Sequence, residues 1–339
     1  MHELVPVHDH TKWKKIVESF EDADIYYNRQ YFLSAVKLDP GEPFLFYYRD
    51  DHGEVAYPFI KRKIMKGSMD FYDITTPFGY GGPILNIVDS TRKLVQHFRE
   101  EFSEFCSREN IIAEFIRFHP WKKNALLFED HLTVLPLYDT FSIDLNQLSA
   151  PRVPLEEDNG GALQTTGSQE PTVKKLGTVR HMFEFLVLYY SAVRRRDEAD
   201  SYYFFTDDYF EALVSSLGPN LHLFGAYYEN KLVTACYVLT TEDTIYHHLE
   251  GSLDEPGIQE AMKALLLKIA EWGKENYYTS FLLGGDYKGE SETADKTRQE
   301  ISNRDPELFY VGHKIHNEAM FKELISAEET DIVKRYRNV

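Results

Sequence analysis

The chain has 339 residues, with 37 Lys and Arg against 55 Asp and Glu, which gives a formal net charge of −18. This acidic balance repels phosphate backbones, so it excludes DNA as a partner and admits tRNA only through a local basic patch. A hydrophobic content of 43% and an aromatic content of 14% predict a folded protein rich in sheet.

The N-terminal sequence, the apolar runs and the cysteines indicate where in the cell the protein is expected. The N-terminus MHELVPVHDHTKWKK has no apolar run of the kind found in signal peptides, and no stretch is long and apolar enough to predict a membrane span. Cys106 and Cys236 are the only cysteines, and each lies in an apolar segment. Two buried thiols are typical of a reducing compartment, so we expect a cytoplasmic protein. The sequence does not indicate an oligomeric state.

The first half of the chain opens with a short amphipathic helix and continues into a hairpin. A glycine-rich strand end, TTPFGYGGPIL, leads to a longer helix and a strand that leaves it. The patterns predict a helix over Thr11–Phe20, a hairpin over 43–64 turned at Asp51-His52-Gly53, a helix over Ser90–Arg108 and a strand over Ile111–Phe118.

The second half repeats this order. We expect a helix over Val179–Val193 and a hairpin over 221–240 turned at Glu229-Asn230. A strand, Ile245–Glu250, then runs through Gly251-Ser252 into a loop with Pro256 and Gly257. A long helix follows, with Met262, Leu265, Leu266, Ile269 and Trp272 on one side, and a short strand, Phe281–Leu283, follows the helix.

Aromatic residues repeat at one offset between the halves. Tyr26, Tyr27, Tyr31 and Phe32 stand 178 positions before Phe204, Phe205, Tyr209 and Phe210. Together with the repeated order, this predicts a duplicated unit. The segment 146–177 is rich in Pro, Gly, Ser and Thr and poor in large apolar residues, which predicts a flexible linker. We therefore expect domains at 1–145 and 178–339.

The end of the strand Ile245–Glu250 carries a cluster of titratable groups. A group that accepts a proton from an attacking amine fits Glu250 or a neighbouring histidine, and we assign catalysis to Glu250 and His248. Strict alternation along a strand puts His248 and Glu250 on one face and His247 on the other. Elsewhere the histidines are scattered, so no metal-ligand spacing is present.

Several motifs together resemble the FemABX family, bacterial transferases that add amino acids to peptidoglycan precursors. They are TPFGYGGPIL, HHLEGSLDE, AEWGKENY, FLLGGDYKG and FYVGHKIHNEAMFKELI, and they extend over nearly the whole chain. Related members act in cell-surface polysaccharide pathways. The resemblance implies an α/β fold with mixed sheets, in two tandem domains like those of the GNAT acyltransferases.

The resemblance also assigns substrate-binding residues. The family's phosphate-binding lysine falls on Lys37 and its arginine on Arg195, within Arg194-Arg195-Arg196. An idle surface lysine and arginines that complement a helix dipole are the alternative interpretations. The family's aromatic strand residue falls on Tyr246 or His247, and Gly251 and Ser252 line the acyl site beside it.

Three departures from the family pattern bear on the donor. Asn86 stands where the family often has an Asp that can accept a proton. Glu260 and Met262 occupy positions that are glycines in a pyrophosphate-binding turn, which argues against ordinary coenzyme A binding. The family's Phe-Lys pair is absent, which leaves Arg298 as the nearest cation and argues against aminoacyl-tRNA.

The first hypothesis is an acyltransferase that moves an acyl or aminoacyl group onto an amine of a phosphate-bearing cell-envelope precursor. Its donor is aminoacyl-tRNA or acyl-CoA, without a metal. The acceptor is expected in a cleft between the domains, held by Lys37 and Arg195. The second hypothesis is an amino-sugar N-acetyltransferase that uses acetyl-CoA, and the third is a duplicated binding module without catalysis.

Overall fold

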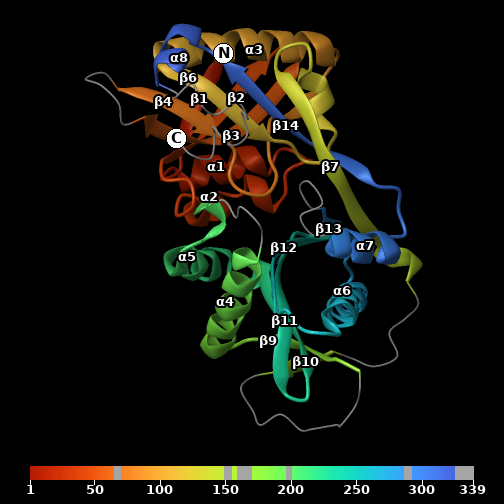
Figure 1. The fold of residues 1–339 in the computed structure, drawn as a ribbon. Coiled ribbons are helices and arrows are strands. Elements are labelled where there is room, and N and C mark those ends of the chain that lie inside the picture. The colour runs from red at the N-terminus through yellow and green to blue at the C-terminus, as the bar shows by residue number, and fades with distance from the viewer. Residues whose placement is uncertain (65–69, 149–154, 159–169, 196–200, 286–291, 325–339) are drawn as a thin grey trace. The chain divides into compact units, whose positions relative to one another are not determined.

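The computed structural model describes residues 1–64, 70–148, 155–158, 170–195, 201–285 and 292–324 (Figure 1). The chain forms two compact units that interleave along the sequence. Unit 1 contains Met1–Leu137, Phe205–Ser216 and the chain from Phe309 onward, and unit 2 contains Tyr138–Phe204 and Leu217–Leu308.

The sheet of unit 1 is antiparallel except for one parallel pair, β4 with β6. A further short strand, β5 (Ile84–Ile87), pairs with β3. In spatial order the strands are β1 (His2–Pro6), β2 (Glu42–Asp50), β3 (Gly53–Ile64), β4 (Phe71–Thr75), β6 (Ile111–Arg117) and β14 (Glu307–Ile315).

The sheet of unit 2 repeats this plan with the same directions, β12 and β13 being the parallel pair. A short strand, β8 (Glu156–Asp158), extends it beside β9. In spatial order the repeated strands are β9 (Thr172–Leu176), β10 (Leu221–Tyr228), β11 (Lys231–Thr240), β12 (Thr244–Ser252), β13 (Ser280–Gly284) and β7 (Thr133–Asp144). The repeated order expected from the sequence is confirmed.

Each half of the chain supplies the last strand of the other half's sheet. The end of β7 pairs with β13, in register Ile143 to Phe281, and the end of β14 pairs with β6, in register Ile315 to Ala113. The segment 146–177, where we expected a linker, contains β8 and β9. These pairings explain why the units interleave rather than follow one another.

The helices pack on both faces of the sheets. Unit 1 holds α1 (His10–Val17), α2 (Arg29–Ala35), α3 (Thr91–Arg108), α8 (Glu318–Leu324) and most of α5 (Asp207–Leu217). In unit 2, α4 (Val179–Arg194) and α6 (Ile258–Glu275) lie on opposite faces of the sheet, and α7 (Glu292–Ile301) packs on α6 (Figure 1). Short 3₁₀ turns occur at Ile25–Tyr27, Asn124–Phe128, Leu145–Gln147, Ser201–Tyr203 and Gly218–Asn220.

Local sequence explains where the helices begin. The Ser90 side chain accepts a hydrogen bond from the backbone N–H of Lys93 and starts α3. Thr178 starts α4 in a reciprocal capping box with His181. The expected turn between β10 and β11 is confirmed, because Glu229 and Asn230 have φ values of 47° and 71°.

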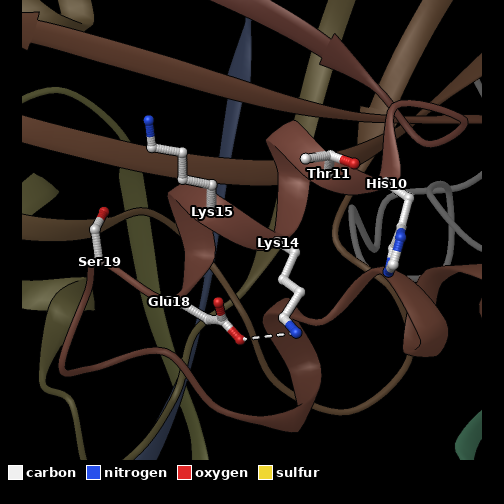
Figure 2. A pocket seen from close by; sticks show the side chains of 6 residues that line it. All are labelled: His10, Thr11, Lys14, Lys15, Glu18 and Ser19. Carbon is white, nitrogen blue, oxygen red and sulfur yellow. Dashed lines mark ion pairs between the residues drawn. The ribbon is translucent and has the colours of Figure 1, made fainter.

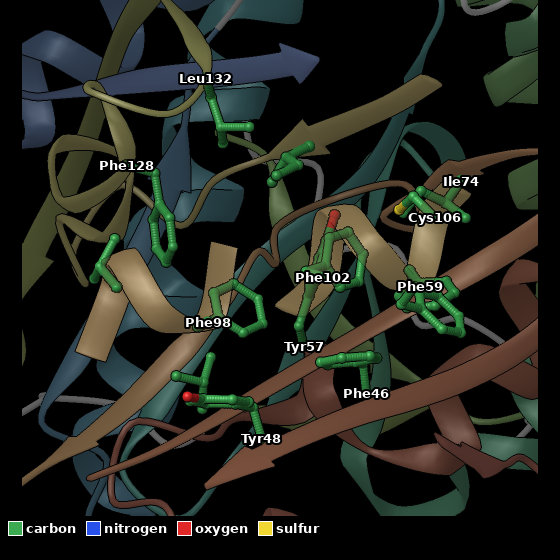
Figure 3. Packing of buried hydrophobic residues seen from close by; sticks show 14 of the residues in the cluster. Phe46, Tyr48, Tyr57, Phe59, Ile74, Phe98, Phe102, Cys106, Phe128 and Leu132 are labelled. Atoms are coloured by element: carbon green, nitrogen blue, oxygen red, sulfur yellow. The ribbon is translucent and has the colours of Figure 1, made fainter. Parts of the chain in front are cut away.

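The core of unit 1 is dominated by aromatic rings that pack edge-to-face or tilted between α3 and the sheet (Figure 3). Phe102 lies at the centre, with ring centroids 5.0 Å from Phe46 and 5.2 Å from Tyr57. Both strand residues and Phe102 are fully buried. The core of unit 2 is more aliphatic, and the apolar side of α6 packs there as predicted from its periodicity.

A buried ionic network ties the exchanged strand β14 into unit 1. Glu114 on β6 accepts hydrogen bonds from Arg99 of α3, one of them at 3.3 Å from Nη1 to Oε2. His316, just past β14, places Nε2 3.2 Å from Oε1 of Glu114. Burial by itself would raise the pKa of Glu114, but Arg99 and His316 outweigh it and hold that pKa at about 2.

Replacing Arg99 by alanine should lower the free energy of unfolding by roughly 3–5 kcal/mol, because it leaves the Glu114 carboxylate buried without its main partner. Urea denaturation measures this loss. The folded carboxyl has a depressed pKa, so its stabilising contribution is present above pH 4.5 and disappears as the pH falls towards 2.

The exposed pair of Lys14 and Glu18 provides the control, since Lys14→Ala should change the stability by less than about 0.5 kcal/mol. The double variant Arg99→Met/Glu114→Leu should recover most of the loss, because both charges are removed together. A loss below about 1 kcal/mol in Arg99→Ala would contradict this role of the network.

Candidate functional site

An extra residue in β12 shapes the candidate site of unit 2. Val238 of β11 pairs with His247, whereas the preceding Tyr237 pairs with Leu249, so His248 has no partner in the register. This is a β-bulge, and it shifts the alternation of side chains along the strand. The sequence-based placement of His247 on the face opposite Glu250 is therefore wrong, because strict alternation does not hold across a bulge.

Three charged or titratable groups meet at the end of β12. Oε2 of Glu250 accepts a hydrogen bond from Nη2 of Arg298 at 3.1 Å, and Nε2 of His247 lies 3.1 Å from the same oxygen. The side chains of His247 and Arg298 are 7% and 8% exposed, whereas that of Glu250 is 22% exposed. Among the three, Glu250 is thus the group that solvent and substrate reach most easily.

Arg298 enters this cluster from α7, beyond the glycine pair that ends β13. In the sequence, Arg298 was the cation nearest to the position where the family's Phe-Lys pair is absent. In the structure, Arg298 contacts the carboxylate of Glu250. A guanidinium fixes a carboxylate by directional hydrogen bonding. Glu250 is therefore held in one orientation by a group from a separate helix.

His248, the bulged residue, is 7% exposed and differs in character from its neighbours. Burial, with a smaller effect from His247, lowers the pKa of His248 to about 3. Its imidazole is therefore neutral and weakly basic at neutral pH. Because the folded pKa lies below the ordinary 6.5, its protonation opposes folding as the pH falls from 6.5 towards 3.

Arg195 joins the end of α4 to the end of β12. Its Nη2 donates to the carbonyl oxygen of Ser252 at 2.9 Å and to the hydroxyl at 3.1 Å. Its Nη1 donates to Ser191 within α4 at 2.8 Å. The side chain is exposed, so the structure brings together Arg195 and Ser252 of the predicted residues in a position open to solvent.

Gly251 allows the close approach of α4 to β12. A Cβ at this position would lie 2.4 Å from the backbone nitrogen of Tyr189 and 2.7 Å from the carbonyl carbon of Leu188. Backbone atoms of a helix cannot move aside as a flexible side chain can. Packing therefore requires glycine at position 251.

Tyr246, the predicted aromatic residue of the same strand, is 3% exposed, so it offers a substrate no open aromatic surface.

The remaining predicted residues lie in unit 1. Lys37 is exposed, just past α2, and makes no ion pair with a described residue. Asn86 donates from Nδ2 to the carbonyl oxygen of Ser19 at 2.9 Å, which is a structural role. Nothing in these contacts assigns either residue to a substrate.

The glycine-rich loop of unit 1 rests on a polar cluster that the sequence did not reveal. Nε2 of His119 lies 3.2 Å from Oδ2 of Asp24, and Nζ of Lys122 lies 3.4 Å from the same oxygen. Burial opposes ionisation of Asp24, but the charge of Lys122 and the hydrogen bonds from His119 and the backbone of Tyr26 hold its pKa at about 2. The only available signal was His119-Pro120 directly after a buried strand, and because Asp24 and His119 are 95 positions apart the sequence did not reveal their contact.

The N-terminus of α6 has no side-chain cap. Gly257 occupies the cap position with φ of 85°, and Glu260 lies in the first helical turn. Met262 belongs to the core, at 8% exposure, so its size is explained by packing. Glu260 remains the group that would oppose an anion at this helix end.

Neither a metal-binding group nor a membrane-spanning helix is found in the described part of the chain. Within it, no group of three or more His, Cys, Asp or Glu side chains is arranged to hold a metal ion. None of the helices described here is both long and apolar enough to cross a bilayer.

Solved structures resemble this chain over nearly its full length. A crystal structure of FemX matches with a TM-score of 0.59 at 11% identity, over 95% of this chain and 99% of that one. The structure of L-PGS from Bacillus licheniformis matches with a TM-score of 0.52 at 13% identity, over 93% and 95%. No protein-family model matches, and no curated protein matches by sequence. The fold is therefore like that of FemX, and the predicted fold class, α/β with mixed sheets in two repeated halves, is confirmed.

Replacing Gly251 by alanine should push α4 away from β12, because the added Cβ meets helix backbone. We expect a loss of stability of about 1–3 kcal/mol, measured by denaturant unfolding. Gly81→Ala is the matched control, because its φ is not positive and the nearest atom to its added Cβ is the side-chain methyl carbon of Thr76, at 3.3 Å. A Gly251→Ala protein as stable as the wild type would contradict the close packing of α4.

Proposed function

We propose that this protein is an acyltransferase that transfers an acyl or aminoacyl group to an amine of a phosphate-bearing cell-envelope precursor. The observation that carries the proposal is Glu250, a partly exposed carboxylate held by Arg298 and His247 at the end of β12. The FemX-like fold supports the same reaction class, because the sequence motifs resemble a family of transferases that add amino acids to peptidoglycan precursors. The sequence motifs support the envelope-precursor acceptor.

Glu250 would accept the proton of the attacking amine. The amine nitrogen forms a bond to the carbonyl carbon of the donor as the bond from that carbon to oxygen or sulfur breaks. The carboxylate takes the amine proton, and the departing alcohol or thiol acquires one from water or from the protonated carboxyl. No enzyme nucleophile is required in this direct transfer.

His247 and Arg298 would act as positioning residues for Glu250. Both are buried and both lie 3.1 Å from the same carboxylate oxygen, so they restrict its rotation without blocking its exposed side. His248 was the second predicted catalytic residue. Its pKa of about 3 makes it a weak base at neutral pH, so we assign the proton transfer to Glu250.

Arg195 in unit 2 and Lys37 in unit 1 would each act as a phosphate-binding cation within its own unit. Arg195 is exposed and lies at the end of β12, where its contact with Ser252 orients the guanidinium. A planar guanidinium binds phosphate with two parallel hydrogen bonds. Lys37 is exposed and has no carboxylate partner among the described residues, which leaves its ammonium available.

Glu250→Gln should lower kcat by about 10²–10⁴ with little change in KM, since the amide cannot accept the proton. Arg195→Ala should instead raise KM for a nucleotide-sugar acceptor and leave kcat nearly unchanged. The assay follows transfer of a labelled acyl group from aminoacyl-tRNA or acetyl-CoA to that acceptor. Glu18→Gln is the matched control, because Glu18 pairs with Lys14 on α1, outside the ionic cluster.

Full activity in Glu250→Gln would remove Glu250 as the proton acceptor. Absence of transfer by the wild-type protein with every donor would favour the third interpretation, a duplicated binding module without catalysis.

An amino-sugar N-acetyltransferase that uses acetyl-CoA is the second candidate. The uncapped N-terminus of α6 favours it, because free backbone N–H groups at a helix start attract a pyrophosphate. Glu260 in the first turn opposes it by repulsion.

A thermal-shift measurement decides between the two donors. If the donor is not coenzyme A, a saturating concentration of coenzyme A should leave Tm unchanged in the wild type. The same concentration of coenzyme A should raise the Tm of Glu260→Gln, because this variant lacks the negative charge that repels the pyrophosphate. A clear rise in the wild type would establish the acetyl-CoA function instead.

A further inference from the structure

The exposed side of α4 carries an apolar stripe. Val179, Phe183 and Val187 are 70%, 53% and 66% exposed. They stand four residues apart, so they lie on one side of the helix in successive turns. Large apolar side chains with this exposure on one line are unusual on a surface, where single exposed apolar residues are the norm.

Arginines stand at both ends of this stripe. Helical geometry puts Arg180, Tyr190 and Arg194 on the same side as the three apolar residues. The stripe from Val179 to Arg194 is roughly 22 Å long, at 1.5 Å per residue. It contains no carboxylate, although the chain as a whole carries a net charge of −18. Glu184 lies beside it and pairs with Arg180 at 2.8 Å.

The orientation of α4 is fixed by its other side. Phe185, Leu188 and Val193 are buried, and Gly251 receives the backbone of Leu188 and Tyr189. Arg195 fastens the end of the helix to Ser252. The helix therefore cannot turn its apolar stripe into the core of unit 2 without losing these contacts.

The repeated fold does not itself require an apolar surface here. The helix that occupies the same place in the order of unit 1 is α1, and its exposed side is polar. A surface cavity of about 400 Å³ runs along that side, lined by His10, Thr11, Lys14, Lys15, Glu18 and Ser19 (Figure 2). The contrast between the two helices indicates that the stripe on α4 serves a purpose particular to unit 2.

The size and charge of the stripe indicate what it contacts. Its three apolar side chains expose roughly 300 Å², far below the roughly 800 Å² that each partner buries in a stable dimer. A bilayer requires less area, because an apolar face between basic residues gains both burial of side chains and attraction to anionic headgroups. The arginines at the two ends and the tyrosine between them fit a lipid interface.

We propose that the stripe of α4 docks unit 2 onto the surface of an anionic lipid bilayer, with Val179, Phe183 and Val187 inserted and Arg180 and Arg194 among the headgroups. The net charge of the chain acts against this over long range, but salt screens it beyond about 8 Å, whereas the arginines act at contact. The end of α4 adjoins Ser252, so an acceptor carried by the bilayer would arrive beside Glu250.

The docking surface is independent of the acyl-transfer proposal, and its test uses no catalysis. Sedimentation of the full-length protein with vesicles measures binding to phosphatidylcholine alone and to an equimolar mixture with phosphatidylglycerol. The wild type should bind the mixed vesicles and bind phosphatidylcholine much more weakly. Phe183→Ser/Val187→Ser should lower the affinity for mixed vesicles at least about tenfold, because the inserted apolar area is lost.

Arg180→Gln/Arg194→Gln should also weaken binding and remove most of its dependence on phosphatidylglycerol and on salt. Two control variants are matched to these changes. Ile87→Ser/Val88→Ser removes two apolar side chains of 50% and 76% exposure elsewhere, and Lys14→Gln/Lys15→Gln removes two cations from α1. Both controls should bind vesicles like the wild type, and circular dichroism should show all variants folded.

Two outcomes would overturn the proposal. One is vesicle binding by Phe183→Ser/Val187→Ser equal to that of the wild type. The other is a wild-type protein that ignores vesicles but forms a dimer in sedimentation velocity that the same variant abolishes, which would assign the stripe to a second copy of the chain.

Discussion

The candidate site depends on one extra residue in β12. Because His248 has no partner in the register with β11, the strand shifts its alternation and brings His247 to the same carboxylate oxygen that Arg298 contacts. Without the bulge, His247 and Glu250 would lie on opposite faces of the sheet. The bulge leaves His248 unpaired in the register, and its consequence is a partly exposed carboxylate with two buried partners.

The parallel between the units makes their difference informative. The six repeated strands have the same order in both sheets, and in each sheet the two strands that flank a long helix form a parallel pair. Unit 1, however, carries the cluster of Asp24, His119 and Lys122, whose side chains are only 5%, 1% and 13% exposed. Unit 2 carries Glu250, with part of its carboxylate exposed. The same plan therefore supports a structural cluster in one unit and a candidate reactive group in the other.

The sequence predicted the elements well because periodicity and capping are local. The helix limits at Ser90 and Thr178 and the turn at Glu229-Asn230 follow from side chains within a few residues of each other. The pairing of β7 with the sheet of unit 2 and of β14 with the sheet of unit 1 could not be predicted. Both sheets offer an equivalent edge, and the apolar pattern of a strand does not specify which strand it pairs with. The family resemblance located Arg298 and Arg195, but their contacts with Glu250 and Ser252 required the structure.

Buried polar contacts were the least predictable part of the molecule. Arg99, Glu114 and His316 come from three distant positions, and each residue alone is typical of a solvated surface. The bulge at His248 was also invisible, since His247-His248 reads as ordinary strand sequence. The exposure of the α4 stripe could not be predicted either. Apolar residues that recur every four positions normally indicate the buried side of a helix, but here the opposite side of α4 is more apolar and is buried instead.

The central claim is that Glu250, His247 and Arg298 act together, with Glu250 as the proton acceptor and the other two residues orienting it. A double-mutant cycle on the rate of acyl transfer tests it most directly, with Glu250→Gln, Arg298→Met and the two combined. If Arg298 acts by orienting Glu250, the combined variant should be about as slow as Glu250→Gln alone. Losses that multiply, so that the double variant is slower than Glu250→Gln by the full factor of Arg298→Met, would contradict the account.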